Sequence, residues 1–460
     1  MRRDPALEAH IATALVAAAG SAEAHYVAVD IAVAADDPLA FIALPIDDRF
    51  YFERRNEGLR VLALGCRQAI ETRGPQRFSQ ADARQRALRR RIHGARRDGP
   101  LLTGGFAFAA DPRPSATWKG YPAVRLVLPE LLWFESGSER SAQAFAPVQP
   151  GETAEQVAAR CAALVAHWET LLQDRPTRTH SAREATRFEI SADRPGSDFC
   201  TTAERALRDI AAGDLEKLVL ARSARIDTAG GFDVERSLDN LRRAHPTCAV
   251  FAVGRGNAAF IGATPERLLR VRGTSAETSA VAGSAPRGRD PQEDDALARA
   301  LQESKKEQSE HAVVVRALRA AFETSCDEFS APEAPRLLRL EGVQHLETPL
   351  RGRLRGDTTL LELAGRLHPT PAVGGWPHAA ALAWISDHEH CDRGWYAGLV
   401  GYLDAAGGGE LCVALRSALL RRDTAHLLAG AGLVAGSEPE AELRETRLKL
   451  RTLLHALVEI

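Results

Sequence analysis

The chain has 460 residues, 45% of them hydrophobic, and its 59 lysines and arginines nearly balance its 61 aspartates and glutamates. This length allows one large domain or several ordinary ones, and the charge balance argues against nucleic acid as the main partner. The seven cysteines lie far apart and form no CxxC pair, so neither a zinc site nor a disulfide framework is indicated.

The start of the chain favours an amphipathic helix over a signal peptide. Its apolar stretch is preceded by a basic start, but Asp4, Glu8 and His10 interrupt the approach to that stretch. No apolar run in the sequence approaches the ~20 residues that a membrane span needs. We therefore expect a cytoplasmic protein without a membrane partner.

The first part of the chain is predicted to be rich in strands. Segments with β-branched and aromatic residues stand between turn signals, at residues 25–34, 40–45, 49–54 and 124–135. Residues 84–97 contain seven arginines and are predicted to form a basic surface helix. The polar stretch 174–184, which contains a proline, is predicted to be a connector.

After this stretch, strands and helices come in runs. Ser197 and Asp198 precede a predicted helix that closes on Gly213. One long helix is predicted over residues 291–323. The last helix is predicted from a capping-box pattern, Ser437 with Glu440. Strands are predicted at residues 215–226, 249–254, 258–264, 266–273, 395–405, 410–420 and 426–436. Runs of this kind indicate an α+β fold and not a doubly wound sheet.

Two side chains are candidates for acid–base chemistry. Strand alternation puts Lys217 on the same face as Val219, so its ammonium would be partly desolvated and could act as a base. Glu266 follows Thr264-Pro265 between two apolar strands, where apolar surroundings would keep a carboxyl group protonated as a general acid. Taken alone, each segment favours the ordinary alternative, which is a solvent-exposed lysine for Lys217 and a turn glutamate for Glu266.

Carboxylates on two predicted helices form a candidate metal site. Glu442, Glu445 and Lys449 share one face of the last helix, and Glu310 stands mid-helix before an apolar run. Carboxylate oxygens without Cys or His at ligand spacing suit Mg²⁺. A solvated charged face around Glu310 is the alternative.

Two other patterns are poor candidates for a site. The glycine-rich run 430–436 does not have the spacing of a dinucleotide-binding loop. His388 and His390 form an HxH pair that has no third ligand nearby in the sequence.

Read together, these features resemble the chorismate-utilising enzymes, a family that includes isochorismate, salicylate, anthranilate and aminodeoxychorismate synthases. The resemblance covers about residue 201 to the C-terminus. It rests on blocks in the family's order: LEKLVLARSARI, FIGATPERLL, SAVAGSAPRG, SKKEQSEHAVVV, VQHLETPLRGRL, LHPTPAVGG, DRGWYAGLVGYLDA, ELCVALRSALL and GAGLVAGSEPEAELRETRLKL.

The resemblance implies one large α+β domain with two stacked, mainly antiparallel sheets and helices outside. Residues 1–175 would be the variable N-terminal part of this fold, and residues 185–460 the chorismate-binding catalytic region. Lys217 would be the general base, Glu266 the general acid, and Glu310, Glu442 and Glu445 the Mg²⁺ carboxylates. Substrate contacts would come from Gly283, Ser284, His345, Tyr396, Arg416, Gly430, Ala431, Gly432 and Lys449.

The implied reaction is the conversion of chorismate to isochorismate, in which water adds at ring carbon C2 and hydroxide leaves C4. Within the family, aminodeoxychorismate synthases typically have lysine at the position of Ala282, and salicylate and anthranilate synthases typically have threonine at that of Ala372. Both residues here favour a reaction that stops at isochorismate, without a glutamine amidotransferase subunit. Salicylate synthase and the large subunit of anthranilate synthase are the alternatives.

Overall fold

The computed structural model describes residues 4–33, 36–173, 188–340 and 342–458, and within them the strands form two large sheets. Nearly all pairings are antiparallel, and β1 with β5 is a parallel pair. The first sheet contains β1 (His25–Asp30), β2 (Asp48–Arg54), β3 (Leu59–Leu64), β5 (Ile92–His93), β8 (Leu131–Ser136), β9 (Glu139–Val148), β10 (Phe188–Ala192), β11 (Lys217–Thr228), β12 (Ala249–Arg255), β13 (Ala258–Thr264), β19 (Gly375–Trp376), β22 (Ser417–Arg421) and β23 (Thr424–Leu433).

The second sheet contains β4 (Gln68–Thr72), β6 (Pro100–Phe106), β7 (Val124–Leu128), β14 (Arg267–Arg272), β15 (Ser275–Pro286), β16 (Cys326–Ser330), β17 (Arg336–Arg339), β18 (Val343–Leu354), β20 (Leu399–Asp404) and β21 (Gly409–Val413). Both sheets combine strands from the first 150 residues with strands from the last 200. The predicted α+β fold with two mainly antiparallel sheets is thereby confirmed.

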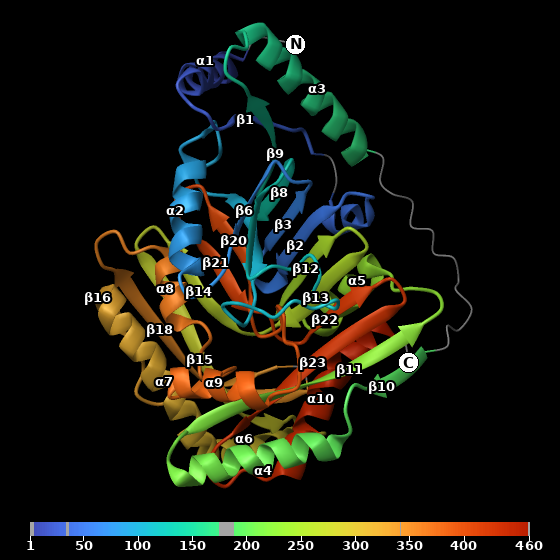
Figure 1. Ribbon diagram of the computed structural model, residues 1–460, viewed down its shortest axis with the longest axis vertical. Helices are drawn as coiled ribbons and strands as arrows, with labels where there is room; N and C mark the ends of the chain where they lie inside the picture. Colours follow the sequence, from blue (N-terminus) through green and yellow to red (C-terminus); the bar gives the residue numbers. More distant parts are fainter. Residues whose placement is uncertain (1–3, 34–35, 174–187, 341, 459–460) are drawn as a thin grey trace.

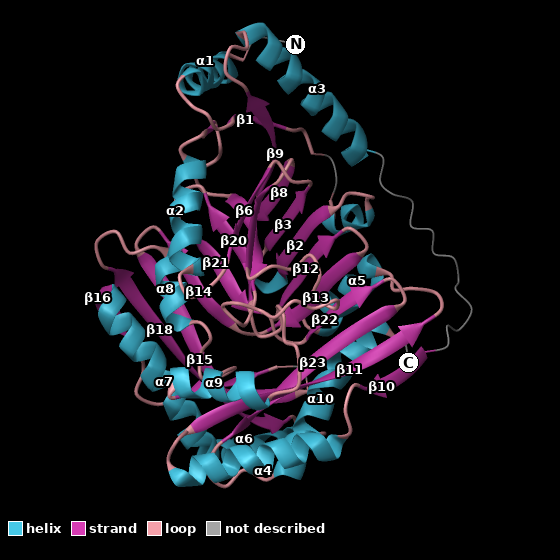
Figure 2. Ribbon diagram, viewed as in Figure 1, coloured by secondary structure: helices cyan, strands magenta, loops and turns pink. Residues whose placement is uncertain are grey.

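Helices lie around the sheets, as Figures 1 and 2 show. They are α1 (Pro5–Ala19), α2 (Arg77–Arg89), α3 (Ala154–Gln173), α4 (Gly196–Ala212), α5 (Val234–Ala244), α6 (Pro291–Glu303), α7 (Lys305–Ser325), α8 (Leu360–Leu367), α9 (His378–His388) and α10 (Pro439–Leu457), with the 3₁₀ segments η1 (Pro38–Ala43) and η2 (Arg55–Glu57). No helix in this described part is long and apolar enough to cross a membrane.

Two hydrophobic cores follow from strand alternation. In β2, Phe50 and Phe52 point into the core between the sheets, whereas Tyr51 points to the other face. That second core packs the first sheet against α1, α3, α5 and α10. The sheets are therefore held together by side chains from distant parts of the sequence.

Several predicted elements have different bounds. The helix predicted over 291–323 is two helices, because Ser304 has an extended backbone and caps α7 through Glu307 N–H. The segment predicted as a strand over 410–420 is β21 and β22, separated at Arg416, whose φ is 46°. Residues 38–43 form η1 and not a strand.

The helix ends also differ in detail from the prediction. Helix α4 begins at Gly196, and Gly213 closes it with φ 88°, as predicted. Ser437 does not cap α10, because its hydroxyl accepts the N–H of Val434 instead. The predicted connector 174–184 lies outside the described residues.

Candidate active site

One pocket gathers most of the predicted site residues. It has about 850 Å³ of empty space, its open mouth included, and strands of both sheets line it together with α7 and α10. The predicted residues that line it are Glu266, Gly283, Ser284, Glu310, His345, Tyr396, Arg416, Gly430, Gly432, Glu445 and Lys449. Lys217, Ala431 and Glu442 are not among its lining residues.

Glu266 lies between β13 and β14 and is 6% exposed. Its backbone is fixed on both sides: its N–H donates to Thr264 Oγ1 over 3.2 Å, and its carbonyl accepts Val413 N–H over 3.0 Å. Burial raises the pKa of Glu266 to about 7, although the charges of Lys217 and Lys449 act in the opposite direction. This carboxyl group is therefore poised to exchange a proton near neutral pH.

Lys217 begins β11 and is fully buried. Its Nζ lies 2.9 Å from Glu310 Oε1. A Cβ atom built on Gly432 would overlap the Glu310 carboxylate and would lie 3.4 Å from Lys217 Cε. Because Gly432 lines the pocket, Lys217 lies next to the pocket wall at this position. Val219 lines the pocket, as the alternation from Lys217 predicts.

Four carboxylates on α7 and α10 lie close to one another, namely Glu307, Glu310, Glu442 and Glu445. Glu310 pairs with Lys217, Glu445 Oε1 lies 2.7 Å from Lys449 Nζ, and Glu442 Oε1 lies 2.8 Å from Lys306 Nζ. Burial and the neighbouring Glu445 raise the pKa of Glu442, against the effect of Lys306.

Glu307, which lies one turn before Glu310 on α7, also belongs to this cluster. Burial and the charge of Glu310 raise its pKa, and its Oε2 accepts Ser284 N–H over 2.9 Å. Glu307 and Glu310 are spaced i, i+3, as are Glu442 and Glu445, and this spacing was the signal that could have found it.

The donor set fits a hard divalent cation, because it offers only carboxylate oxygens and carries crowded negative charge that a cation would offset. Within the described residues, however, no three acidic, His or Cys side chains already converge on one point. Of this cluster on α7 and α10, Glu310 and Glu445 line the pocket, which Glu266 also lines from the loop after β13. Glu310 and Glu445 are the residues that would hold Mg²⁺ at this pocket.

Cationic and polar groups line the rest of the pocket. Arg416 is partly buried, and its Nη1 has no hydrogen-bond partner among the residues described. Lys449 Nζ donates to the Gly430 carbonyl over 2.9 Å. Burial and the charge of Arg416 lower the pKa of His345 to about 3, so its imidazole is neutral, and its Nδ1 lies 2.9 Å from Ser284 Oγ. The site can thus receive an anionic ligand.

Ala431 lies in the hydrophobic core, because strand alternation turns its side chain away from the pocket that Gly430 and Gly432 line. Any contact of Ala431 with a ligand would have to use its backbone. The sequence did not predict the other apolar residues of the pocket wall, which are Pro265, Val281, Val373, Leu415, Leu428 and Ala429. Ala282 and Ala372, the two positions that separate members of the family, both line the pocket.

Neither of the two other patterns forms the cofactor or metal site that it superficially resembles. The glycine-rich run starts within β23 and forms no dinucleotide-binding loop before a helix. In the HxH segment, Glu389 pairs with Arg393, and neither histidine belongs to a metal-binding group in the described part of the chain.

Many of the seven arginines at 84–97 bind neighbouring acids or carbonyls, for example Arg86 with Asp82 and Arg91 with Glu23.

Comparisons with known proteins point to one family. A family model described as "Chorismate binding enzyme" matches residues 13–458. The salicylate biosynthesis isochorismate synthase of Pseudomonas aeruginosa is 39% identical over 90% of this chain and 86% of its own. The isochorismate synthase MenF of Bacillus subtilis is 34% identical over 78% of this chain and 75% of its own. The structure of the menaquinone-specific isochorismate synthase MenF from Escherichia coli superposes with a TM-score of 0.78 at 26% identity and covers 97% of this chain and 100% of that one.

Proposed function

The chain belongs to the chorismate-binding enzyme family, and from this premise we propose that it is an Mg²⁺-dependent isochorismate synthase. It adds water to C2 of chorismate and releases hydroxide from C4. The names of its relatives support this reaction within the family.

The observation that carries the proposal is a buried carboxyl group that lines the pocket, together with a buried amine close enough for its charge to act on that carboxyl group. Glu266 is neutral up to about pH 7, and the charge of Lys217 acts on it directly. Replacing one hydroxyl group by another needs a base for the incoming water and an acid for the leaving hydroxide. Hydroxide is a poor leaving group, so the acid must be protonated before the step begins.

Each residue then has one role. Lys217, in its neutral form, takes a proton from water as the oxygen attacks C2. Glu266 donates its proton to the C4 oxygen, which leaves as water. Arg416 and Lys449 bind the substrate carboxylates, because guanidinium and ammonium groups form strong charge-assisted hydrogen bonds with them. Mg²⁺, held by Glu310 and Glu445, would bind a substrate carboxylate and offset its charge.

Incubation of the purified protein with chorismate and Mg²⁺, followed by chromatography of the products, tests the proposal. Isochorismate as the main product supports it. Salicylate with stoichiometric pyruvate would instead identify a salicylate synthase. Anthranilate formed from chorismate and ammonia would identify an anthranilate synthase subunit, which needs a glutamine amidotransferase partner that we do not expect here.

A further inference from the structure

Strand β11 is unpaired along the middle of one edge: within the described part of the chain, no strand lies beside residues 219–223 on that side. Its other edge pairs with β23 over residues 218–227. On the open edge, Lys217 and Leu218 pair with β19, and residues 224–228 pair with β10. Buried backbone N–H and C=O groups need partners, so residues 219–223 must be satisfied in another way.

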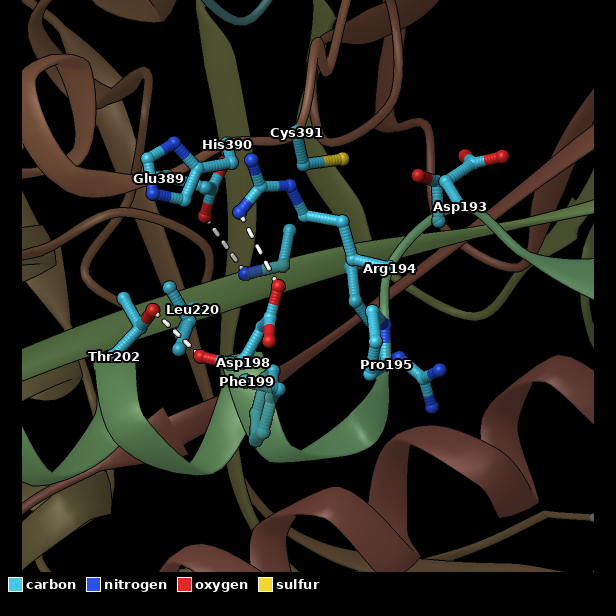
Figure 3. Close-up of a pocket in the computed structure, with 13 residues that line it drawn as sticks. Asp193, Arg194, Pro195, Asp198, Phe199, Thr202, Leu220, Glu389, His390 and Cys391 are labelled. Atoms are coloured by element: carbon cyan, nitrogen blue, oxygen red, sulfur yellow. Dashed lines mark hydrogen bonds and ion pairs between the residues drawn. The ribbon is translucent and has the colours of Figure 1, made fainter.

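The Gly374 carbonyl accepts Val219 N–H over 2.9 Å, and Glu389 and Arg393 supply two further partners. Ala221 N–H donates to Glu389 Oε2 over 2.7 Å, and Arg393 Nη2 donates to the Val219 carbonyl over 2.7 Å. The two side chains also bind each other through two hydrogen bonds of 2.6 and 2.7 Å. Figure 3 shows Glu389 beside the strand, where it forms one wall of a crevice with His390 and Cys391.

Arg393 reaches a second wall of the candidate active site. Its Nη1 donates to the Val373 carbonyl over 2.7 Å, and its guanidinium carbon lies 4.2 Å from the centroid of the Phe108 ring. Val219 and Val373 both line the pocket, and Tyr396, which also lines it, donates its N–H to the Arg393 carbonyl. The side chains of Arg393 and Glu389 are only 3% and 2% exposed.

From this arrangement we infer that Glu389 and Arg393 are positioning residues, which hold the Lys217 strand in register with the loops that carry Ala372 and Tyr396. The inference deepens the proposed function and rests on it. A two-bond arginine–carboxylate pair fixes geometry as well as charge. Apolar side chains of similar volume could fill the space but could not bind the edge of the strand.

The consequence for catalysis follows from the placement of Lys217. It lies two residues before Val219 on the same strand, so a shift of this edge moves its amine relative to Glu266. A displacement of 1 Å can lower a rate about 100-fold. Loss of the pair should therefore reduce kcat much more than it reduces chorismate binding, because Arg416 and Lys449 lie on other elements.

The test compares Arg393→Lys with a matched control, Arg54→Lys. Arg54 forms an equally buried ion pair with Glu410, between β2 and β21, and neither residue lines the pocket. Lysine keeps the charge but cannot reach Glu389 and two carbonyls together. Steady-state kinetics across pH 6–9, circular dichroism and amide hydrogen exchange are measured for both variants.

We expect Arg393→Lys to lower kcat by about 10- to 100-fold with little change in KM. Its pH profile should shift, and the amides of residues 219–223 should exchange faster. Arg54→Lys should lose thermal stability but keep wild-type kcat and pH profile. If folded Arg393→Lys keeps kcat within about twofold of the control, the inference is wrong.

Glu389→Gln is the second variant, for use if Arg393→Lys does not fold. It keeps the acceptor for Ala221 N–H but loses the charge, and wild-type kcat in this variant would also overturn the inference. Failure of the unmodified protein to make isochorismate would contradict the proposed function instead. The hydrogen-exchange comparison would then still test whether the pair holds the strand.

Discussion

Lys217 Nζ lies 2.9 Å from Glu310 Oε1, which joins the strand that carries the proposed base to the helix that carries a proposed metal ligand. Both side chains are largely buried, so each compensates the charge of the other. A cation at Glu310 would compete with the Lys217 amine for this carboxylate. The base and the metal are thus expected to be coupled.

Removal of the amine tests the role of the base. Lys217→Met keeps the length of the side chain and should lower kcat by about 10²–10⁴-fold, the usual effect of losing a general base. Chorismate binding, measured by calorimetry, should persist because Arg416 and Lys449 remain. Lys119→Met, at an exposed position, is the matched control and should be fully active. A folded Lys217→Met variant with more than about a tenth of wild-type kcat would exclude this role.

The pH dependence of stability tests the state of Glu266. Its folded pKa of about 7 lies above the ordinary value of 4.5, so the folded protein holds this proton over a pH range in which the unfolded chain has released it. The free energy of unfolding contributed by Glu266 is therefore fully present below about pH 4.5 and is lost as the pH rises through 7.

Glu266→Gln removes this dependence. From pH 5 to pH 8 its stability should rise relative to that of the wild-type protein, by at most about 1.4 kcal/mol per pH unit. Urea denaturation at each pH gives the difference. A constant difference across this range would mean that the carboxyl group is not held protonated. The same variant should lose kcat by about 10²–10⁴-fold, because an amide cannot supply the proton.

Removal of the metal tests the carboxylate cluster. Activity should disappear in EDTA and return with Mg²⁺, and calorimetry should show weaker Mg²⁺ binding for Glu310→Gln and Glu445→Gln. Glu440→Gln, on an exposed position of the same helix α10, should bind Mg²⁺ normally. Full activity in the chelator would contradict the proposed dependence.

Substitutions at Ala372 test whether this residue stops the reaction at isochorismate. Ala372→Thr places a hydroxyl group in the pocket wall and should increase pyruvate release, followed with lactate dehydrogenase. Ala372→Val has nearly the same shape without the hydroxyl and should not. An identical product mixture for both variants would place this specificity elsewhere in the pocket.

A substitution at Gly432 tests the packing between β23 and α7. A methyl group at this position would overlap the Glu310 carboxylate and displace it from Lys217. Gly432→Ala should therefore lower activity and weaken Mg²⁺ binding together. Gly20→Ala is the control, because a Cβ atom there meets nothing within 4 Å. Unchanged Mg²⁺ binding in Gly432→Ala would show that Glu310 is not a ligand.

The sequence by itself determined the fold class and most of the pocket. Alternation and capping act between near neighbours, so β11, β12 and β13 and the closure of α4 at Gly213 could be predicted from the residues involved. The ordered blocks of the family then identified eleven residues that line one pocket. Local rules were less accurate where one residue breaks a pattern, as Ser304 does between α6 and α7.

Only the tertiary structure decided how these residues act on one another. The pKa of Glu266 depends on burial by distant strands, and the partners of Lys217 and Glu442 lie 93 and 136 residues away. No local pattern gave Glu389 or Arg393 a role, yet both bind the edge of a strand about 170 residues earlier. Such contacts depend on the register and stacking of two sheets, and a periodicity of two or 3.6 residues carries no information about them.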